Sequence, residues 1–258
     1  MALALVNIVV EFLPISSTAH VILLNRFLAS GTSLKLPLAI SQLAVDLVLC
    51  LHFRKIIGRT IRNFFSDRKT RLFCYNIILT SLPFLIVGAL FGRTVRKYFY
   101  SSSTIAIFLI LGGVFLIFAE NHPNEKRTTA KGMDSLEEIE PSTMYRIGLA
   151  QMFSIVPGVS RSACTIGSAL LSGLPRETAV DFSFFISIPV GIAGSMFDIL
   201  GEVTLGISNY RLPVCYFIVS TIVPLFFAKR MLEFLKSHRL SIFGYYRILL
   251  GTVSLLIP

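Results

Sequence analysis

The apolar residues of this chain come in long uninterrupted blocks, and these blocks restrict the possible folds more than any other feature of the sequence. Of the 258 residues 54% are hydrophobic and 15% are charged, whereas a soluble domain has about 25% charged residues. Blocks of about 20 apolar residues are what a helix needs to cross roughly 30 Å of hydrocarbon. We therefore predict an all-α polytopic protein, a single integral membrane domain over residues 1–258 with the bilayer as its surroundings.

The blocks differ in whether they are continuous. Six have the length and composition of full membrane spans, at about 36–53, 72–91, 103–119, 178–200, 212–228 and 244–258. Two others are interrupted, the first at Pro14 and the second at Pro157-Gly158. Each is predicted to form a re-entrant hairpin of two short helices, which membranes tolerate only where protein or a wet cavity surrounds the break. The chain thus divides into halves of about 1–119 and 144–258, each a broken-helix hairpin plus three transmembrane helices, joined by a polar loop at 120–143.

The basic residues predict an orientation. With the loop 54–71 placed in the cytoplasm, sixteen of the 24 Lys and Arg residues fall on the cytoplasmic side and six on the other, as the positive-inside rule requires. The first hairpin then enters from outside and the second from inside, so the two halves form an inverted repeat, an architecture typical of transporters. Because these loops account for the formal charge of +10, we expect no nucleic-acid partner.

Each interruption carries a dense polar cluster. Residues 11–20 contain a carboxylate, three hydroxyls and an imidazole, and residues 156–165 contain Arg161 among further hydroxyls. Polar groups in lipid are costly, so such clusters are candidate functional sites. Ser16, Ser17 or Thr18 can cap one helix, and Ser160 or Ser162 the other. Two helix N-termini at the protein centre would offer free N–H groups and partial positive charge to an anion.

The residue types within the clusters allow more than one chemistry. The Arg161 guanidinium is a planar fork that matches phosphate oxygens, although it could instead pair only with Glu11. Ser17 and His20 are three residues apart and share a helix face, as a nucleophile and its base would. In the alternative, Ser17 caps the helix and His20 donates to a backbone carbonyl. For Gln42 and Asp46, an internal hydrogen bond is the favoured interpretation.

The two clusters together carry a resemblance to a known family. The segments Glu11–His20 and Pro157–Ser162, with 147–151, Phe182 and Tyr246-Arg247, resemble the undecaprenyl-diphosphate phosphatase family of bacteria, which is linked to bacitracin resistance. The resemblance covers nearly the whole chain. It implies an enzyme of the bacterial inner membrane that removes the terminal phosphate of a C55 polyprenyl diphosphate. This reaction recycles the lipid carrier for peptidoglycan synthesis, at a site open to the outer face.

The resemblance also implies roles for particular residues. The catalytic residues would be Glu11, Ser17, His20 and Arg161, and the substrate-binding residues would be Asn7, Ser16, Ser160 and Thr165. Activity would need a divalent cation, Mg²⁺ or Ca²⁺, with Glu11 as its protein ligand. Asn7 stands where the family usually has Glu or Gln, so it can coordinate only through its neutral carbonyl.

The sequence leaves the mechanism and two other functions open. Our hypothesis is that Ser17 attacks phosphorus with His20 as base, while Arg161 and the helix N-termini hold the charged oxygens. A carrier or flippase for a polyprenyl phosphate or another anion would share the fold and Arg161 without needing Ser17 or His20. A catalytically weakened, lipid-binding relative would agree with Asn7. The sequence also leaves a homodimer open.

Overall fold

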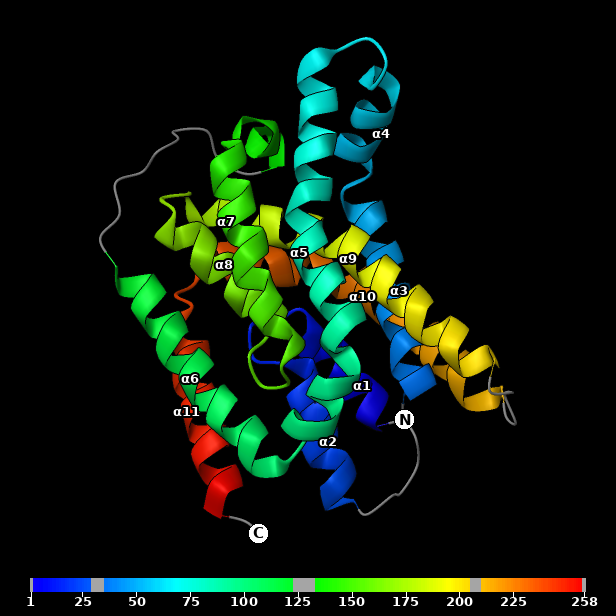
Figure 1. Ribbon diagram of the computed structural model, residues 1–258, viewed down its shortest axis with the longest axis vertical. Coiled ribbons are helices and arrows are strands. Elements are labelled where there is room, and N and C mark those ends of the chain that lie inside the picture. The colour runs from blue at the N-terminus through cyan, green and yellow to red at the C-terminus, as the bar shows by residue number, and fades with distance from the viewer. Residues whose placement is uncertain (1, 29–34, 123–132, 205–209, 257–258) are drawn as a thin grey trace.

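The computed structural model describes residues 2–28, 35–122, 133–204 and 210–256, and within these ranges all regular structure is helical (Figure 1). The helices are α1 (Ala2–Glu11), α2 (Ser17–Phe27), α3 (Lys35–His52), α4 (Arg54–Asn63), α5 (Arg68–Phe99), α6 (Ser102–Asn121), η1 (Met133–Glu138), α7 (Pro141–Met152), η2 (Phe153–Ile155), α8 (Arg161–Leu171), α9 (Arg176–Thr204), α10 (Arg211–Ser237) and α11 (Ser241–Leu256). The predicted all-α polytopic fold is confirmed.

The predicted membrane spans correspond to six of these helices. Five are long and apolar enough to cross a membrane, namely α3, α5, α6, α9 and α10. The sixth, α11, is apolar but shorter, with 16 residues. Several details differ from the prediction: α5 and α10 extend beyond the predicted spans 72–91 and 212–228, to Phe99 and Ser237. The loop 54–71 contains helix α4, and the predicted loop 120–143 contains η1 and the start of α7 at Pro141. A proline suits the first turn of a helix because the amide it lacks has no helical partner there.

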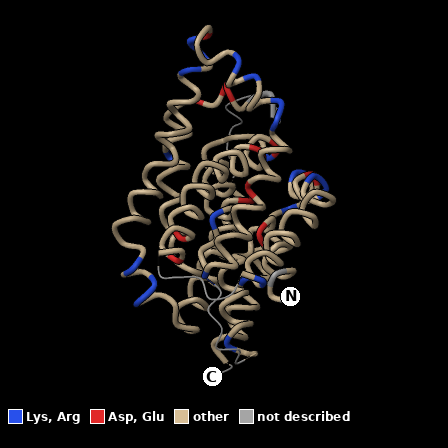
Figure 2. The backbone as a smooth tube through the Cα atoms, turned by 90° about the vertical axis from the view of Figure 1, so that its right-hand side faces the viewer, with Lys and Arg blue, Asp and Glu red and all other residues tan. Residues whose placement is uncertain are grey.

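The long helices present apolar side chains to the surroundings. Along α5, large side chains such as Ile78, Ile86 and Leu90 are more than half exposed. An apolar surface of this extent is unfavourable in water and favourable in lipid. Most of the chain in Figure 2 is uncharged, and Lys and Arg gather at the upper end, around the α4–α5 connection. The molecule is therefore a multi-pass membrane protein.

The two hairpins run in opposite directions. Helix α2 ends near the start of α6, where Arg26 donates to the Tyr100 carbonyl and the Ser102 hydroxyl. Helix α8 ends near the other end of α6, where Leu170 and Glu120 line the same small cavity. Figure 1 shows α2 in the lower half, α8 in the upper half, and the two breaks between them. The hairpins thus enter from opposite ends, as predicted, while the inverted-repeat relation of the complete halves stays a prediction.

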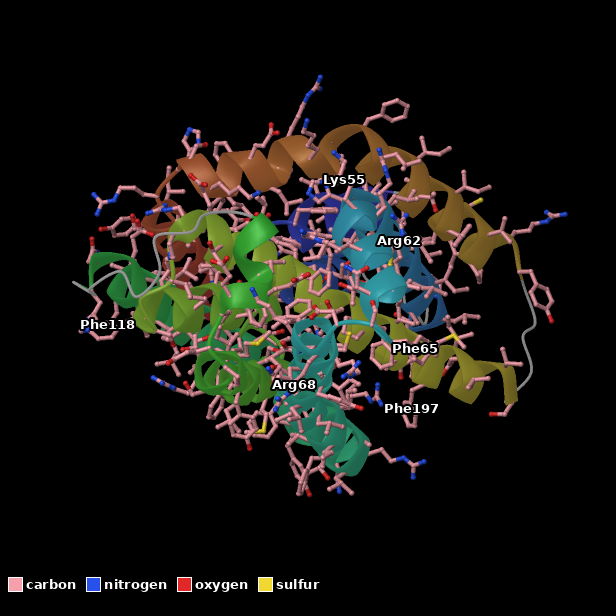
Figure 3. All side chains as sticks on the ribbon, turned by 90° about the horizontal axis from the view of Figure 1, so that it is seen from above. Lys55, Arg62, Phe65, Arg68, Phe118 and Phe197 are labelled. Carbon is pink, nitrogen blue, oxygen red and sulfur yellow. The ribbon has the colours of Figure 1, made fainter. Side chains whose placement is uncertain are left out.

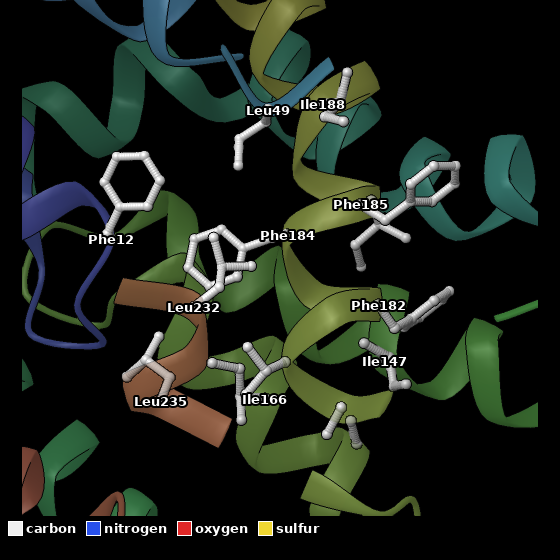
Figure 4. Close-up of a cluster of buried hydrophobic side chains, with 14 of the residues drawn as sticks. Phe12, Leu49, Ile147, Ile166, Phe182, Phe184, Phe185, Ile188, Leu232 and Leu235 are labelled. Carbon is white, nitrogen blue, oxygen red and sulfur yellow. The ribbon is translucent and has the colours of Figure 1, made fainter. Parts of the chain in front are cut away.

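An apolar core fixes the first break against the long helices. The Phe12 ring lies between Phe184 of α9 and Phe227 of α10, with ring centroids 6.0 and 5.3 Å away. Ile147 of α7 and Ile166 of α8 belong to the same buried cluster (Figure 4). Within a membrane such packing stabilises the fold through van der Waals contacts rather than through transfer of the rings out of water. This core holds both hairpins in one packed unit.

Helices α6 and α11 approach each other closely because both carry glycine at their crossing. A Cβ atom on Gly113 would lie 2.6 Å from the Gly244 carbonyl oxygen, and one on Gly244 would lie 2.7 Å from the Gly113 carbonyl oxygen. No real Cβ makes such a contact with backbone, so the crossing requires glycine on both sides. The close approach brings Tyr246 and Arg247, both on α11, next to the two breaks.

Candidate intramembrane active site

The two breaks share an unusual backbone feature. Ser16 precedes α2 with φ 70° and Ser160 precedes α8 with φ 72°, and they are the only non-glycine residues with positive φ in the described chain. A left-handed serine costs about 1–3 kcal/mol and persists only where its surroundings fix it. Ser160 caps α8 as predicted, accepting from the Ala163 amide at 3.4 Å. Ser16 does not cap its own helix.

The Ser16 hydroxyl instead joins the two breaks. Its Oγ accepts a hydrogen bond from the backbone N–H of Gly158 at 3.2 Å, 142 positions along the chain. Gly158 has φ 100°, and a Cβ there would lie 2.6 Å from the Ile105 carbonyl oxygen, so no larger residue fits. The predicted meeting of the two breaks is therefore observed, and Ser16 is part of their contact.

Arg247 of α11 holds both breaks at once. Its Nη1 donates to the Pro14 carbonyl at 3.2 Å, and its Nη2 donates to the carbonyls of Gly158 at 2.6 Å and Val159 at 2.8 Å. The residue is completely buried. Space for the guanidinium comes from Gly112 of α6, where a Cβ would lie 1.8 Å from Nη2. Arg247 thus satisfies carbonyls that the broken helices leave without partners.

A three-residue polar cluster spans the two hairpins. The Ser17 hydroxyl donates to Glu11 Oε2 at 2.5 Å, and Arg161 Nη2 donates to Glu11 Oε1 at 3.2 Å. The side chains of Glu11 and Arg161 are 14% and 22% exposed, so the ion pair is mostly shielded from the surroundings. Charge-assisted bonds are short and strong in such an environment. Glu11 therefore orients both the hydroxyl and the guanidinium.

The predicted Ser17–His20 pair is wrong for this structure. His20 Nδ1 bonds to the Ser16 carbonyl at 2.8 Å, and Nε2 bonds to the Tyr246 hydroxyl at 2.8 Å. Since a carbonyl only accepts, Nδ1 carries a proton. In a neutral ring Nε2 would then accept a hydrogen bond from the Tyr246 hydroxyl. His20 faces α11, so sharing a helix face did not bring it to Ser17. Of the alternative, the bond from His20 to a backbone carbonyl is observed, whereas Ser17 does not cap α2 and donates to Glu11 instead.

A cavity of about 660 Å³ opens beside the polar cluster. Glu11, Ser17 and Arg161 line it, and His20 does not. Its walls are largely apolar, with Val21 and Leu38 among them, while α9 contributes Ser183 and Ser195, whose buried hydroxyls have no hydrogen-bond partner within the described residues. Pockets of this size hold drug-sized ligands. The cavity therefore has room for a charged headgroup and part of an apolar chain.

The mouth of the cavity is charged. Lys35 lies 2.7 Å from Glu202, and Arg96 lies 3.4 Å from Asp198, which Lys35 also approaches at 3.9 Å. Lys35, Arg96 and Asp198 all line the cavity. They come from the ends of α3, α5 and α9 that lie away from the basic α4–α5 connection. In the predicted orientation, the cavity opens toward the outer face.

The other predicted site residues lie near this cluster in different roles. Asn7 and Ser160 line the cavity, and Asn7 donates through Nδ2 to Ser41 at 3.2 Å. Thr165 does not line it and instead donates to the Arg161 carbonyl at 3.0 Å. Thr165 therefore supports the first turn of α8. Gln42 donates to both oxygens of Asp46, the internal hydrogen bond that the sequence favoured.

Two residues that carry part of the family resemblance were given no role from the sequence. Tyr246 and Arg247 both act on the breaks from α11. The sequence did contain one indication, because Arg247 lies inside an apolar span and an ionisable residue in a membrane helix usually has a functional or structural partner. Its contacts could not be read from the sequence because they join carbonyls 88 and 233 positions away.

The fold and site define a polytopic membrane protein with an intramembrane carboxylate–hydroxyl–guanidinium cluster, built where two broken helices meet. Residues 1–253 match the family model described as bacitracin resistance protein BacA, and the chain belongs to that family. Among its relatives is an undecaprenyl-diphosphatase of Neisseria gonorrhoeae, 30% identical over 96% of this chain and 90% of the relative. The undecaprenyl-diphosphatase 3 of Acinetobacter baylyi is 32% identical over 96% of this chain and 92% of the relative.

Proposed function

We propose that this protein hydrolyses undecaprenyl diphosphate to undecaprenyl phosphate and inorganic phosphate in the bacterial inner membrane, recycling the lipid carrier for peptidoglycan synthesis. The observation that carries the proposal is the cluster of Glu11, Ser17 and Arg161 at the cavity. The family membership and the names of the relatives support the same reaction. The apolar cavity walls suit a prenyl chain, and the cluster suits its diphosphate.

We propose a base different from that of our sequence-based hypothesis, because the Ser17 hydroxyl is bonded to Glu11 and not to His20. Ser17 Oγ attacks the terminal phosphorus, and its proton passes to Glu11 Oε2, which already accepts that hydrogen bond. The bond from phosphorus to the bridging oxygen breaks, and undecaprenyl phosphate leaves. Glu11 passes this proton to the departing phosphate oxygen and is ionised again. Water then attacks the phosphoserine and gives a proton to Glu11, the bond from phosphorus to Ser17 Oγ breaks, and Glu11 returns the proton to Oγ as inorganic phosphate is released. The second step restores the Ser17 hydroxyl, so neither an oxidant nor another co-reactant is needed.

Charge stabilisation comes from Arg161 and from the first turns of α2 and α8. Phosphoryl transfer depends mainly on positioning and electrostatic stabilisation. Arg161 donates one hydrogen bond to the carboxylate that also binds the attacking hydroxyl, and the remaining N–H groups of its planar guanidinium suit phosphate oxygens. Within the described residues, no hydrogen-bond acceptor is found for the backbone N–H groups of Ser17, Thr18 and Ser162. These amides are therefore donors for phosphate oxygens, as at other helix N-termini.

The oxygen atoms of Glu11 and Asn7 also suit a divalent cation as ligands. Glu11 offers a carboxylate, and Asn7 offers a carbonyl oxygen because its amide nitrogen is bonded to Ser41. Mg²⁺ commonly uses one or two carboxylates and takes its other ligands from substrate phosphates and water. When bound, Mg²⁺ or Ca²⁺ would neutralise diphosphate charge and polarise the phosphoryl group. The described residues contain no group of three or more His, Cys, Asp and Glu that would bind a metal by themselves.

Phosphate release by the purified protein tests the proposal. Protein in detergent is given undecaprenyl diphosphate with Mg²⁺, with Ca²⁺ or with a chelator, and inorganic phosphate is measured. We expect metal-dependent release that Ser17→Ala reduces at least 100-fold. The matched control is Ser172→Ala, which removes a hydroxyl from the far end of α8, outside the cavity. No release from folded protein would refute the enzyme and favour a carrier or a lipid-binding relative.

A further inference from the structure

Helix α4, the connection that follows it and the start of α5 carry a basic and aromatic surface that the proposed reaction does not use. Ile56 is its buried side chain, packed into the protein. Ile61 and Phe65 lie four residues apart and are 69% and 88% exposed. Lys55 and Arg62 are exposed beside them, and Figure 3, which looks onto this end of the molecule, shows both with Phe65 and Arg68. We call the set Lys55, Ile61, Arg62, Phe65 and Arg68 the α4 surface.

The position of the α4 surface along the membrane normal follows from α5. Between Arg71 and Arg93 this helix has no charged residue. At 1.5 Å per residue the stretch 72–92 spans about 32 Å, close to the thickness of the hydrocarbon core. Arg71 therefore marks the membrane boundary, and Arg68 lies one turn beyond it. The α4–α5 connection, which holds Phe65, lies at the depth of the lipid headgroups.

The charge of this surface is unbalanced within the protein. Residues 54–71 contain seven Lys and Arg and a single acidic residue, Asp67. Asp67 is engaged as the N-cap of α5, accepting from the amides of Lys69 and Thr70. Arg59 lies 3.8 Å from Glu137. In the described part of the chain, no carboxylate partner is found for Lys55, Arg62 or Arg68.

We propose that the α4 surface binds the anionic headgroups of the lipid leaflet at this end of the protein, with Phe65 and Ile61 inserted at the boundary of headgroups and acyl chains. An amphipathic helix with bulky apolar residues beside Lys and Arg binds membrane surfaces in this way. Each Lys or Arg near an anionic leaflet strengthens such binding about fivefold. The positive-inside rule explains the Lys and Arg residues of this loop, but it does not explain why Phe65 among them is 88% exposed. The inference does not depend on the proposed reaction.

The absence of tryptophan from this sequence makes a direct test available. Full-length Phe65→Trp protein, with its single indole, is reconstituted into bilayers of phosphatidylcholine alone or with one third phosphatidylglycerol. Brominated acyl chains then report whether the indole reaches the lipid. We expect emission at shorter wavelength and stronger quenching when phosphatidylglycerol is present, and a smaller response at high salt, because screening weakens surface electrostatics.

Two further variants make the test decisive. Phe197→Trp places the indole on an exposed position of α9, away from the α4 surface, and its quenching should not depend on phosphatidylglycerol. Phe65→Trp combined with Lys55→Gln, Arg62→Gln and Arg68→Gln should lose the dependence on anionic lipid. All of these residues are exposed and outside the catalytic cluster, so phosphate release should stay near wild type. Water-like, unquenched emission from Phe65→Trp, or equal quenching in both bilayers, would overturn the proposal.

Discussion

Replacing Arg247 by methionine tests whether the meeting of the two breaks is imposed from α11. The change leaves the buried carbonyls of Pro14 and Gly158 and the partly buried carbonyl of Val159 without this donor. Each buried polar group left unpaired costs about 1–3 kcal/mol, so the two buried carbonyls alone cost roughly 2–6 kcal/mol. Removing the buried guanidinium also removes a desolvation penalty of several kcal/mol. The two effects oppose each other, so we expect only a modest change in thermal stability.

The larger effect of Arg247→Met should appear in turnover. Without the clamp, the breaks can relax from the strained conformations of Ser16 and Ser160, which carries Ser17 away from Arg161. A displacement of about 1 Å at a reacting centre can reduce the rate about 100-fold. We therefore expect kcat to fall about 100-fold. Arg247→Lys should lie between the two proteins, because an ammonium keeps the charge but cannot span the carbonyls of both breaks.

A glycine substitution tests the same reasoning without removing the charge. In Gly112→Ala the new Cβ would meet Arg247 Nη2 at 1.8 Å, so the guanidinium must move. Gly88→Ala is the matched control, because its Cβ would meet only a side-chain atom of Ile155 at 3.9 Å. The assay is phosphate release per folded molecule, with folding followed by thermal unfolding in detergent. Near-normal turnover in both Arg247→Met and Gly112→Ala would refute the clamp.

Two further predictions concern residues away from the catalytic cluster. Tyr246→Phe removes the hydroxyl that bonds to His20 Nε2 but keeps the bond from His20 to Ser16. We expect the free energy of unfolding to fall by about 0.5–1.5 kcal/mol and kcat to fall less than tenfold. A loss of kcat as large as that of Ser17→Ala would place His20 in the chemistry. Hydrogen bonds from the Thr70 hydroxyl and from the Thr70 and Lys69 amides lower the pKa of Asp67. The ionised Asp67 therefore stabilises the fold above the unfolded-state pKa of about 3.9, and this stabilisation is lost as pH falls through the lower pKa of the folded state. Thermal unfolding of wild type and Asp67→Asn should therefore differ at pH 6 and converge at the most acidic pH, and a constant difference would contradict this.

The sequence was sufficient for the features set by local composition. Long apolar blocks predicted the spans, and proline with clustered hydroxyls predicted both breaks, because polar groups inside apolar segments have few structural solutions. Helix α4 was missed because its charge resembles that of a loop, whereas Ile56 shows that one side of it is buried. Local signals therefore predict where the chain breaks better than how an exposed segment folds.

Contacts between segments far apart in the sequence were harder to predict. The spacing of Ser17 and His20 predicts a shared helix face but not what that face meets. Packing against α11 turns His20 toward Tyr246, and the first hairpin turns Ser17 toward Glu11. The Glu11–Arg161 contact was only an alternative to phosphate binding in the sequence analysis, although a shielded guanidinium requires a partner. The partners of Arg247 are backbone carbonyls, which no residue type reveals.

A double-mutant cycle between Glu11 and Arg161 tests most directly whether the two hairpins form one catalytic site. The kcat/KM for phosphate release is measured for wild type, Glu11→Gln, Arg161→Lys and the double variant. Because the two side chains are bonded to each other at 3.2 Å, we predict that their effects do not add, with a coupling free energy of about 0.5–3 kcal/mol. Effects that add to within about 0.5 kcal/mol would show that the two residues act independently, and would contradict a single site shared by the two hairpins.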